Sequence, residues 1–312
     1  MSNLISSVSP HFFTKRNTRM IMLDVIIALL PAAVASVIVF GPRSLLVTGA
    51  CTASCIIFEF GFEKLCRREN TIGDLSAVVT GILLAFNLPV SIPIWQAVFG
   101  SLVAIVVVKQ LFGGIGQNFA NPAITARIVM MVAFSGSMTN WVYPGTEKMP
   151  DAVSSATPLT AAAKGSLSMM PSYMDLFLGR HAGCIGETCA LALLVGGIYL
   201  IIRRVISWHT PLVFIATVAL MSFFCGKDPL YQVLSGGLML GAIFMATDYS
   251  TTPHTRWGKV IFGVGCGLIT VLIRFWGNLP EGVSFSILIM NIFTPYIDKL
   301  TRVRPLAGGA EK

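Results

Sequence analysis

Charged side chains are scarce in this sequence: 12% of its 312 residues are Asp, Glu, Lys or Arg, whereas 54% are hydrophobic. Soluble globular chains carry about 25% charged residues. With a mean hydropathy of +0.77, the composition excludes a soluble enzyme and indicates an integral membrane protein. The net charge of +8 does not indicate nucleic-acid binding, because the basic residues stand in short clusters between apolar runs.

Motifs for metals and for common active sites are also lacking. The seven cysteines include no C-x-x-C pair, and the four histidines show no metal-ligand spacing. We therefore expect neither a metal site nor an iron–sulfur cluster built from this chain alone. No Walker A loop, H-E-x-x-H or G-x-S-x-G element occurs, so no catalytic residue is predicted. Cys184 and Cys189 could pair only if their loop faces an oxidising compartment.

Long apolar runs are what the sequence has instead. A transmembrane helix needs about 20 mainly apolar residues. We predict an all-α membrane protein with about ten transmembrane helices, the third and fifth short enough to be broken or tilted. The runs lie at about 20–40, 44–62, 74–90, 94–112, 122–138, 187–203, 209–225, 230–247, 257–276 and 281–298.

The basic residues predict how the chain lies in the membrane. With a cytoplasmic N-terminus, sixteen of the 22 basic residues, Arg127 among them, fall in inner segments. The positive-inside rule then places both termini in the cytoplasm and the loop 139–186 outside it. This loop divides one membrane domain, 1–312, into a first half, 1–138, and a second half, 187–312.

The two halves contain similar segments. Residues 76–85 precede Pro89 and Trp95, and residues 235–244 precede Pro253 and Trp257 in the same manner. The matched segments belong to the third and eighth runs, five spans apart, and an odd offset predicts halves inverted across the membrane. Chance similarity between Gly-rich apolar helices is the alternative.

A polar stretch in the 139–186 loop predicts a short helix. Thr157 has the residue type of an N-cap, and Pro158 suits the first helical position. A helix N-terminus also favours a phosphate, so we expect Thr157 to present an exposed hydroxyl where an attached phosphate group would be held. A plain N-cap without any modification is the alternative.

Two polar loops border apolar runs at the predicted inner face. The first, 113–123, contains Asn118 and Asn121, and the second, 247–253, contains Thr247 and Asp248. Non-helical backbone at membrane depth is tolerated where it is buried by protein or lines a cavity. These side chains could bind the edge of a heterocycle; ordinary inside loops, the second with an Asx-turn, are the alternative.

Two carboxylates lie inside apolar runs, where ionisable groups are costly and often functional. Asp24 lies in the inner third of its run, where pairing or snorkelling is possible. Glu59, Glu63 and Arg67 are spaced four residues apart on one helix face. We expect a local ion-pair ladder there rather than an ion path.

Taken together, these elements resemble the D subunits of Rnf electron-transport complexes and, more distantly, the B subunits of sodium-pumping NADH:quinone reductases. The most specific piece, Asp151-x-x-Ser154-x-Ala156-Thr157, is similar to the signature at which a flavin transferase attaches FMN to threonine through a phosphoester; Ser155 replaces the usual glycine. The resemblance covers nearly the whole chain and includes Ser9-Pro10-His11, Ala28–Pro31, and the loops 113–123 and 247–253.

The resemblance implies a urea-transporter-like fold of two inverted five-helix halves in the cytoplasmic membrane. It implies covalent FMN on Thr157, and a second, non-covalent flavin, riboflavin, for which Asn118, Asn121, Thr247 and Asp248 are our candidates. It further implies electron relay between NADH and ferredoxin, coupled to Na⁺ or H⁺ movement, with other Rnf subunits as partners. The alternatives are a solute channel of the same fold, a structural anchor, and the quinone-reductase B subunit, which typically has a longer N-terminal extension.

Overall fold

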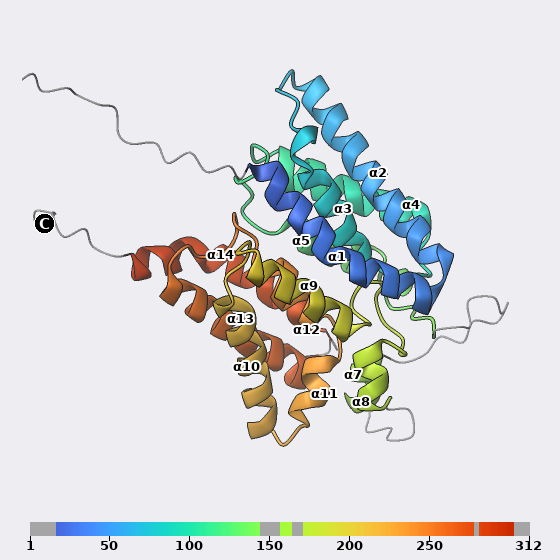
Figure 1. Ribbon diagram of the computed structural model, residues 1–312, viewed down its shortest axis with the longest axis vertical. Coiled ribbons are helices and arrows are strands. Elements are labelled where there is room, and N and C mark those ends of the chain that lie inside the picture. The colour runs from blue at the N-terminus through green and yellow to red at the C-terminus, as the bar shows by residue number, and fades with distance from the viewer. Residues whose placement is uncertain (1–16, 144–156, 164–170, 278–280, 303–312) are drawn as a thin grey trace, which may run out of the picture.

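The computed structural model describes residues 17–143, 157–163, 171–277 and 281–302, and these form an all-helical assembly (Figure 1). Its helices are α1 (Thr18–Phe40), α2 (Pro42–Leu65), η1 (Ile72–Asp74), α3 (Ser76–Phe86), α4 (Ile94–Leu102), η2 (Val103–Gln110), α5 (Pro122–Ala133), α6 (Ser135–Met138), α7 (Pro158–Ala163), α8 (Tyr173–Leu178), α9 (Ala190–Ile202), α10 (His209–Phe224), α11 (Pro229–Leu234), α12 (Leu238–Leu240), η4 (Gly241–Met245), α13 (Arg256–Trp276) and α14 (Val283–Thr301).

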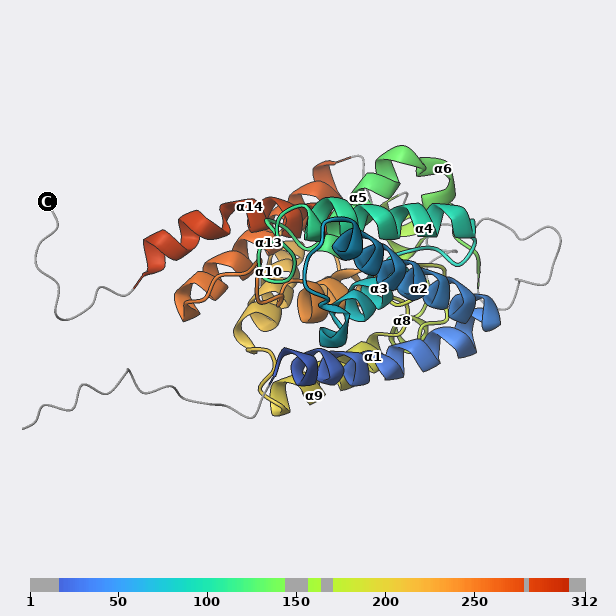
Figure 2. The same ribbon diagram turned by 90° about the horizontal axis from the view of Figure 1, so that it is seen from above.

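Each of the ten predicted apolar runs contains a helix. Within the described ranges, α1, α2 and α13 are long and apolar enough to cross a membrane, and the other apolar helices are shorter. The structure therefore confirms a helical membrane protein. Figures 1 and 2 show α1 beside α9, and α10 beside α13, so segments far apart in sequence form the helix pairs.

The third and eighth runs are both interrupted. The third run forms only the eleven residues of α3, and nine of these are buried. A helix that is apolar on all sides belongs in a core rather than against lipid. The eighth run forms α11, a turn at 235–237, and then α12 continuing into η4. We expected the third and fifth runs to be short enough to be broken or tilted. The third forms a single eleven-residue helix, and the fifth is interrupted between Ala133, where α5 ends, and Ser135, where α6 begins.

The loop before α9 covers the broken end of α3. The backbone N–H of Ile185 donates to the carbonyl of Leu88 at 3.0 Å, and that of Gly186 donates to the carbonyl of Phe86 at 3.0 Å. These bonds use carbonyl groups that a continuous helix would have used itself. A Cβ at position 186 would overlap the Phe86 side chain, so glycine permits this close approach.

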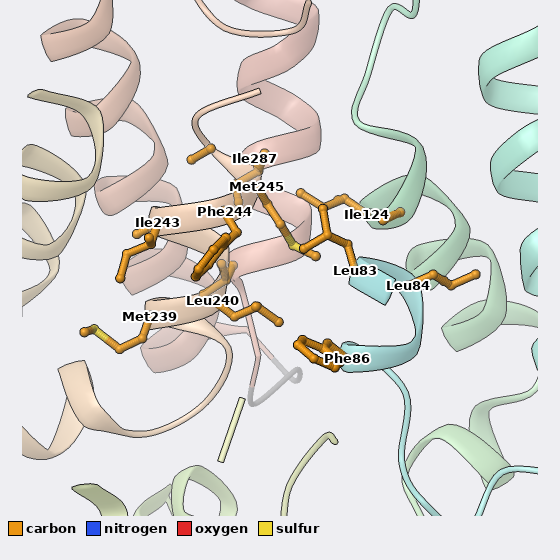
Figure 3. Packing of buried hydrophobic residues seen from close by; sticks show 14 of the residues in the cluster. Leu83, Leu84, Phe86, Ile124, Met239, Leu240, Ile243, Phe244, Met245 and Ile287 are labelled. Atoms are coloured by element: carbon orange, nitrogen blue, oxygen red, sulfur yellow. The ribbon is translucent and has the colours of Figure 1, made fainter. Parts of the chain in front are cut away.

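The two interrupted runs meet in the centre of the molecule. Figure 3 shows side chains of α3 packed against those of α12 and η4, with α5 and α14 closing the cluster. The amide of Asn87, just after α3, also lies 3.6 Å from the Met245 sulfur. The core therefore joins the halves before and after the 139–186 loop. Its labelled members are Leu83, Leu84, Phe86, Ile124, Met239, Leu240, Ile243, Phe244, Met245 and Ile287.

Candidate functional site

Thr157 caps the helix that the sequence predicts. Its Oγ1 accepts a hydrogen bond from the backbone N–H of Thr160 at 3.3 Å, and Pro158 begins α7. The expectation of an exposed hydroxyl is wrong, because Thr157 is only 4% exposed. The other predicted residues of this motif, Asp151, Ser154, Ser155 and Ala156, lie outside the described residues.

Docking of α7 on the second half explains why Thr157 is buried. The Tyr231 hydroxyl donates to the carbonyl of Pro158 at 3.2 Å. Leu159 is buried and lies against the turn after α11, where a Cβ on Gly236 would come within 2.6 Å of the Leu159 side chain. Gly236 has φ +68°, a conformation that favours glycine. Thr157 therefore sits where α7 meets the broken eighth run.

The two predicted inner loops come together around one pocket. It has a cavity volume of about 100 Å³ and is partly open to the outside. Its walls come from α1, α3, the start of α5 and the segments that follow α9 and η4. All four residues proposed from the sequence line it: Asn118, Asn121, Thr247 and Asp248.

The four side chains are engaged to different degrees. Asn121 caps α5 by accepting from the N–H groups of Ala123 and Ile124 at 3.1 and 3.3 Å. The hydroxyls of Ser250 and Thr251 both donate to Asp248 at 3.1 Å. The remaining two residues differ: the Thr247 hydroxyl donates to the carbonyl of Ile243 at 2.7 Å, whereas Oδ1 of Asn118 is buried without a hydrogen-bond partner among the described residues. Asn118 thus offers the open acceptor.

A buried ion pair lies at the wall of this pocket. Lys109 lines the pocket and donates to Glu59 at 2.7 Å and to the Ser76 hydroxyl at 2.6 Å. Glu63 instead accepts from the Thr71 hydroxyl and backbone N–H. The predicted ladder to Arg67 is therefore wrong: no ion pair joins Arg67 to either carboxylate in the described structure. Asp24 is paired, at 3.2 Å, with Arg203.

A second buried charge cluster occupies the middle of the protein. The guanidinium of Arg127 on α5 donates to the Asn87 side-chain oxygen at 2.7 Å and forms an ion pair with Glu281. Glu187 lies 3.9 Å from the same guanidinium. The Cys184 thiol lies 3.5 Å from it and remains free, as does Cys189. The disulfide that the sequence allowed does not form.

Arg274 extends this cluster toward α7. Its guanidinium donates to the carbonyls of Gln232 and Ser235 at 2.7 and 3.2 Å. A Cβ on Gly237, two residues after Ser235, would lie 3.0 Å from Glu187 and 3.4 Å from Arg127. Buried polar groups therefore run from the α7 docking turn to Asn87, which lies against Met245 of η4.

The sequence reasoning missed this central cluster. Arg127, Glu187 and Glu281 are far apart in the chain, and each lies at or near the end of an apolar run. The available signal was a charged residue within the first six positions of a predicted apolar run. Arg127 was assigned instead to an inner segment.

The loop that carries Cys184 and Glu187 is itself held by a histidine. His181 is buried, and its two ring nitrogens lie 3.1 Å from the carbonyl of Ala182 and 3.2 Å from that of Thr188. Burial lowers the pKa of His181, which favours the neutral ring. A neutral ring carries one N–H, so it donates to one of these two carbonyls and adds no charge to the cluster.

Comparison with known proteins covers almost the full chain. The model described as the NQR2, RnfD, RnfE family matches residues 5–307. The D subunit of the Na⁺-translocating ferredoxin:NAD⁺ oxidoreductase complex of Acetobacterium woodii is 48% identical over 304 residues, which cover 97% of this chain and 95% of that protein.

Two further relatives extend the match. The D subunit of the proton-translocating ferredoxin:NAD⁺ oxidoreductase complex of Clostridium ljungdahlii is 40% identical, with 95% of this chain and 94% of that protein covered. The D subunit of the ion-translocating oxidoreductase complex of Stutzerimonas stutzeri is 38% identical, with 93% and 92% covered. The chain therefore belongs to the NQR2, RnfD, RnfE family.

Proposed function

We propose that this chain is the D-type membrane subunit of an Rnf-type complex that relays electrons between NADH and ferredoxin and couples this to Na⁺ or H⁺ translocation. The observation that carries the proposal is similarity over nearly the full length to the D subunits of such complexes. The sequence has no nucleotide or iron–sulfur motif. Partner subunits of a hetero-oligomer would supply both groups.

The proposed architecture is ten spans in two inverted five-helix halves, as in urea transporters, within the cytoplasmic membrane. The third and eighth runs, which the repeat pairs with each other, are both broken, and their helices α3 and η4 meet in the core. Inverted-repeat membrane proteins commonly place discontinuous helices at the interface between the halves. This arrangement supports the proposal.

Thr157 is the proposed attachment point for FMN, with Asp151, Ser154, Ser155 and Ala156 read by a flavin transferase. FMN would supply one- and two-electron redox chemistry when bound. The Thr157 oxygen accepts from the Thr160 N–H and also lies 3.2 Å from the Thr160 hydroxyl. A phosphoester oxygen keeps lone pairs for the contact with the N–H. Helix α7 has six residues, so its dipole would attract the phosphate only weakly. The covalent bond to Thr157, rather than the helix N-terminus, would hold the phosphate in place.

Burial of Thr157 adds a condition to this proposal. A transferase cannot reach a side chain that is 4% exposed. The hydrogen bond between Pro158 and Tyr231 and the packing of Leu159 would have to be absent while the transferase acts. We therefore propose that modification precedes the docking of α7.

The inner pocket is the proposed site of the second flavin. The buried, unpartnered Oδ1 of Asn118 fits an N–H group on the edge of a flavin ring. Asn121, Thr247 and Asp248 already have protein partners and would shape the pocket wall. Riboflavin carries no phosphate. Among the described residues that line the pocket the one cation is Lys109, and it is already paired with Glu59. The pocket therefore suits a flavin without a phosphate.

One experiment separates the two flavins. The chain is expressed with its flavin transferase and the purified protein is denatured, so that covalent flavin stays with the polypeptide and bound riboflavin is released. We expect Thr157→Ala to abolish in-gel flavin fluorescence but to leave the released riboflavin unchanged. Asn118→Ala should leave the in-gel flavin fluorescence unchanged and lower the amount of released riboflavin. Ser155→Gly should carry covalent flavin at least as completely as the wild type.

Two results would count against these assignments. Fluorescence that survives Thr157→Ala would place the tether elsewhere. Absence of both flavins from the wild-type protein would favour a solute channel of the same fold or a structural anchor. A channel would also need a polar route through the core.

A further inference from the structure

An apolar groove opens on the side of the molecule between α9 and α10. It has a volume of about 370 Å³, within the range of about 300–1,000 Å³ typical of ligand pockets. Its floor is Ile243 of η4, and Gly197 allows α9 to approach that floor closely. The side chains that line the groove are all apolar except for the indole N–H of Trp208: Leu194, Ile198, Ile201, Ile206, Pro211, Leu212, Ile215, Ala216 and Ile243.

A small polar pocket adjoins one end of the groove, and the two share Ile206. Its polar lining includes Ser207, Thr210, His254 and Lys259. These residues belong to the beginnings of α10 and α13 or to the segments just before them. Hydroxyl and basic groups beside an apolar groove match a molecule with a phosphate at one end and a hydrocarbon chain at the other.

Helix α10 begins beside this polar pocket, because Thr210 of its first turn lines it. No side chain caps the N-terminus of α10, so its first N–H groups have no partner within their own helix. Oxyanions are favoured at such positions by the free N–H groups and the helix dipole.

The local charge balance favours an anion. Lys259 forms no ion pair within the described structure, and Arg204 is exposed in the turn after α9. Of the neighbouring acids, Asp298 accepts the His254 backbone N–H at 3.0 Å, and Asp248 is held by two hydroxyls. Arg203 already shares its charge with Asp24.

We propose that this composite site binds one anionic phospholipid, with its phosphate in the polar pocket and an acyl chain in the groove. A free phosphate would not use the groove, and a neutral hydrocarbon would not use the donors. The basic segments at this end are those expected at the cytoplasmic face, where anionic lipids attract Lys and Arg. Ile206, Thr247 and Tyr249 line both the polar pocket and the inner pocket. The lipid would therefore contact the outer surface of the wall that encloses the inner pocket, whether or not a flavin occupies it.

Native mass spectrometry of the detergent-solubilised full-length chain tests this site. The probe is phosphatidylglycerol, titrated into delipidated protein, and the readout is the fraction carrying a single tightly held adduct. Ala216→Phe fills the groove and should abolish that adduct. Lys259→Gln should weaken it about fivefold, the change expected for one basic residue at an anionic surface.

Matched variants and competitors distinguish the sources of binding. Ala219→Phe lies one turn further along α10 outside the groove, and Arg256→Gln lies in the first turn of α13 outside the polar pocket. Both should bind like the wild type, and inorganic phosphate should not compete. Equal adducts in all variants, complete competition by phosphate, or no tight adduct in the wild type would each overturn the proposal.

Discussion

At the scale of single residues, Arg127 has the most consequential position in the described structure. It is buried between Glu281 and Glu187 and also holds Asn87, so it joins α5 to loops on both sides of the core. A buried charge that loses its partner costs more than the pair contributes. Arg127 therefore fixes the relative positions of elements that are distant in sequence.

Removing Arg127 should destabilise the protein strongly. Arg127→Met leaves two carboxylates buried together, and we expect a loss of about 3–5 kcal/mol in the free energy of unfolding. Arg203→Met is the matched control: its side chain is 50% exposed and its pair with Asp24 should contribute at most about 1 kcal/mol. Denaturant titration in detergent measures both, and similar losses for the two variants would contradict the assignment.

The sequence predicted residues whose surroundings are local and missed those whose partners are distant. Thr157 as an N-cap and the polar loops around Asn118 and Asp248 follow from neighbouring residue types. The ion pair between Glu59 and Lys109 could not be read from spacing, because its members lie on different helices, and the local ladder was chosen instead. The burial of Thr157 likewise depends on Tyr231, 74 positions later in the chain.

At the scale of elements, the broken end of α3 depends on the loop that docks against it. Ile185 and Gly186 donate to carbonyls at and just after the end of α3, and Gly186 leaves no room for a Cβ against Phe86. The length of the third run predicted that it is broken or tilted. Which loop completes the break could not be predicted, because that pairing is set by the tertiary fold.

Gly186→Ala should separate this loop from α3. Overpacking of a filled core typically costs about 1–3 kcal/mol, and we expect that loss in denaturant titrations. The cost should shrink in a Phe86→Ala background, since the overlapping side chain is then gone. Gly61→Ala in α2, where a Cβ meets nothing within 4 Å, should be neutral or stabilising. An additive double mutant would argue against direct contact between the two positions.

At the scale of the whole molecule, the ten apolar runs were predictable because a bilayer demands long apolar segments. The positions of the charged residues were less predictable. Arg127 and Lys109 were assigned to inner segments, yet both are buried in ion pairs. Arg127 contacts Glu187 and Glu281, which begin runs predicted to enter from the outer side. When such buried residues are left out of the count of basic residues on the two sides of the membrane, the predicted inner side still has more of them.

The predicted orientation can be measured directly. An accessibility reporter placed after Lys148 should respond from outside the cytoplasm, and one placed after Arg68 should respond from inside, because basic loops are retained in the cytoplasm. Single cysteines labelled with a membrane-impermeant reagent in intact cells serve as the readout. A cytoplasmic signal at Lys148 would reverse the topology and place Thr157 on the wrong face for the proposed attachment.

The central claim is that this chain holds a redox group through Thr157. The most direct test is peptide mass spectrometry on the protein purified in its native complex from cells that contain the flavin transferase. The account predicts that the peptide containing Thr157 carries the mass of one FMN less one water, with fragment ions that place it on that threonine. An unmodified Thr157 peptide from a complex that still transfers electrons between NADH and ferredoxin would contradict it.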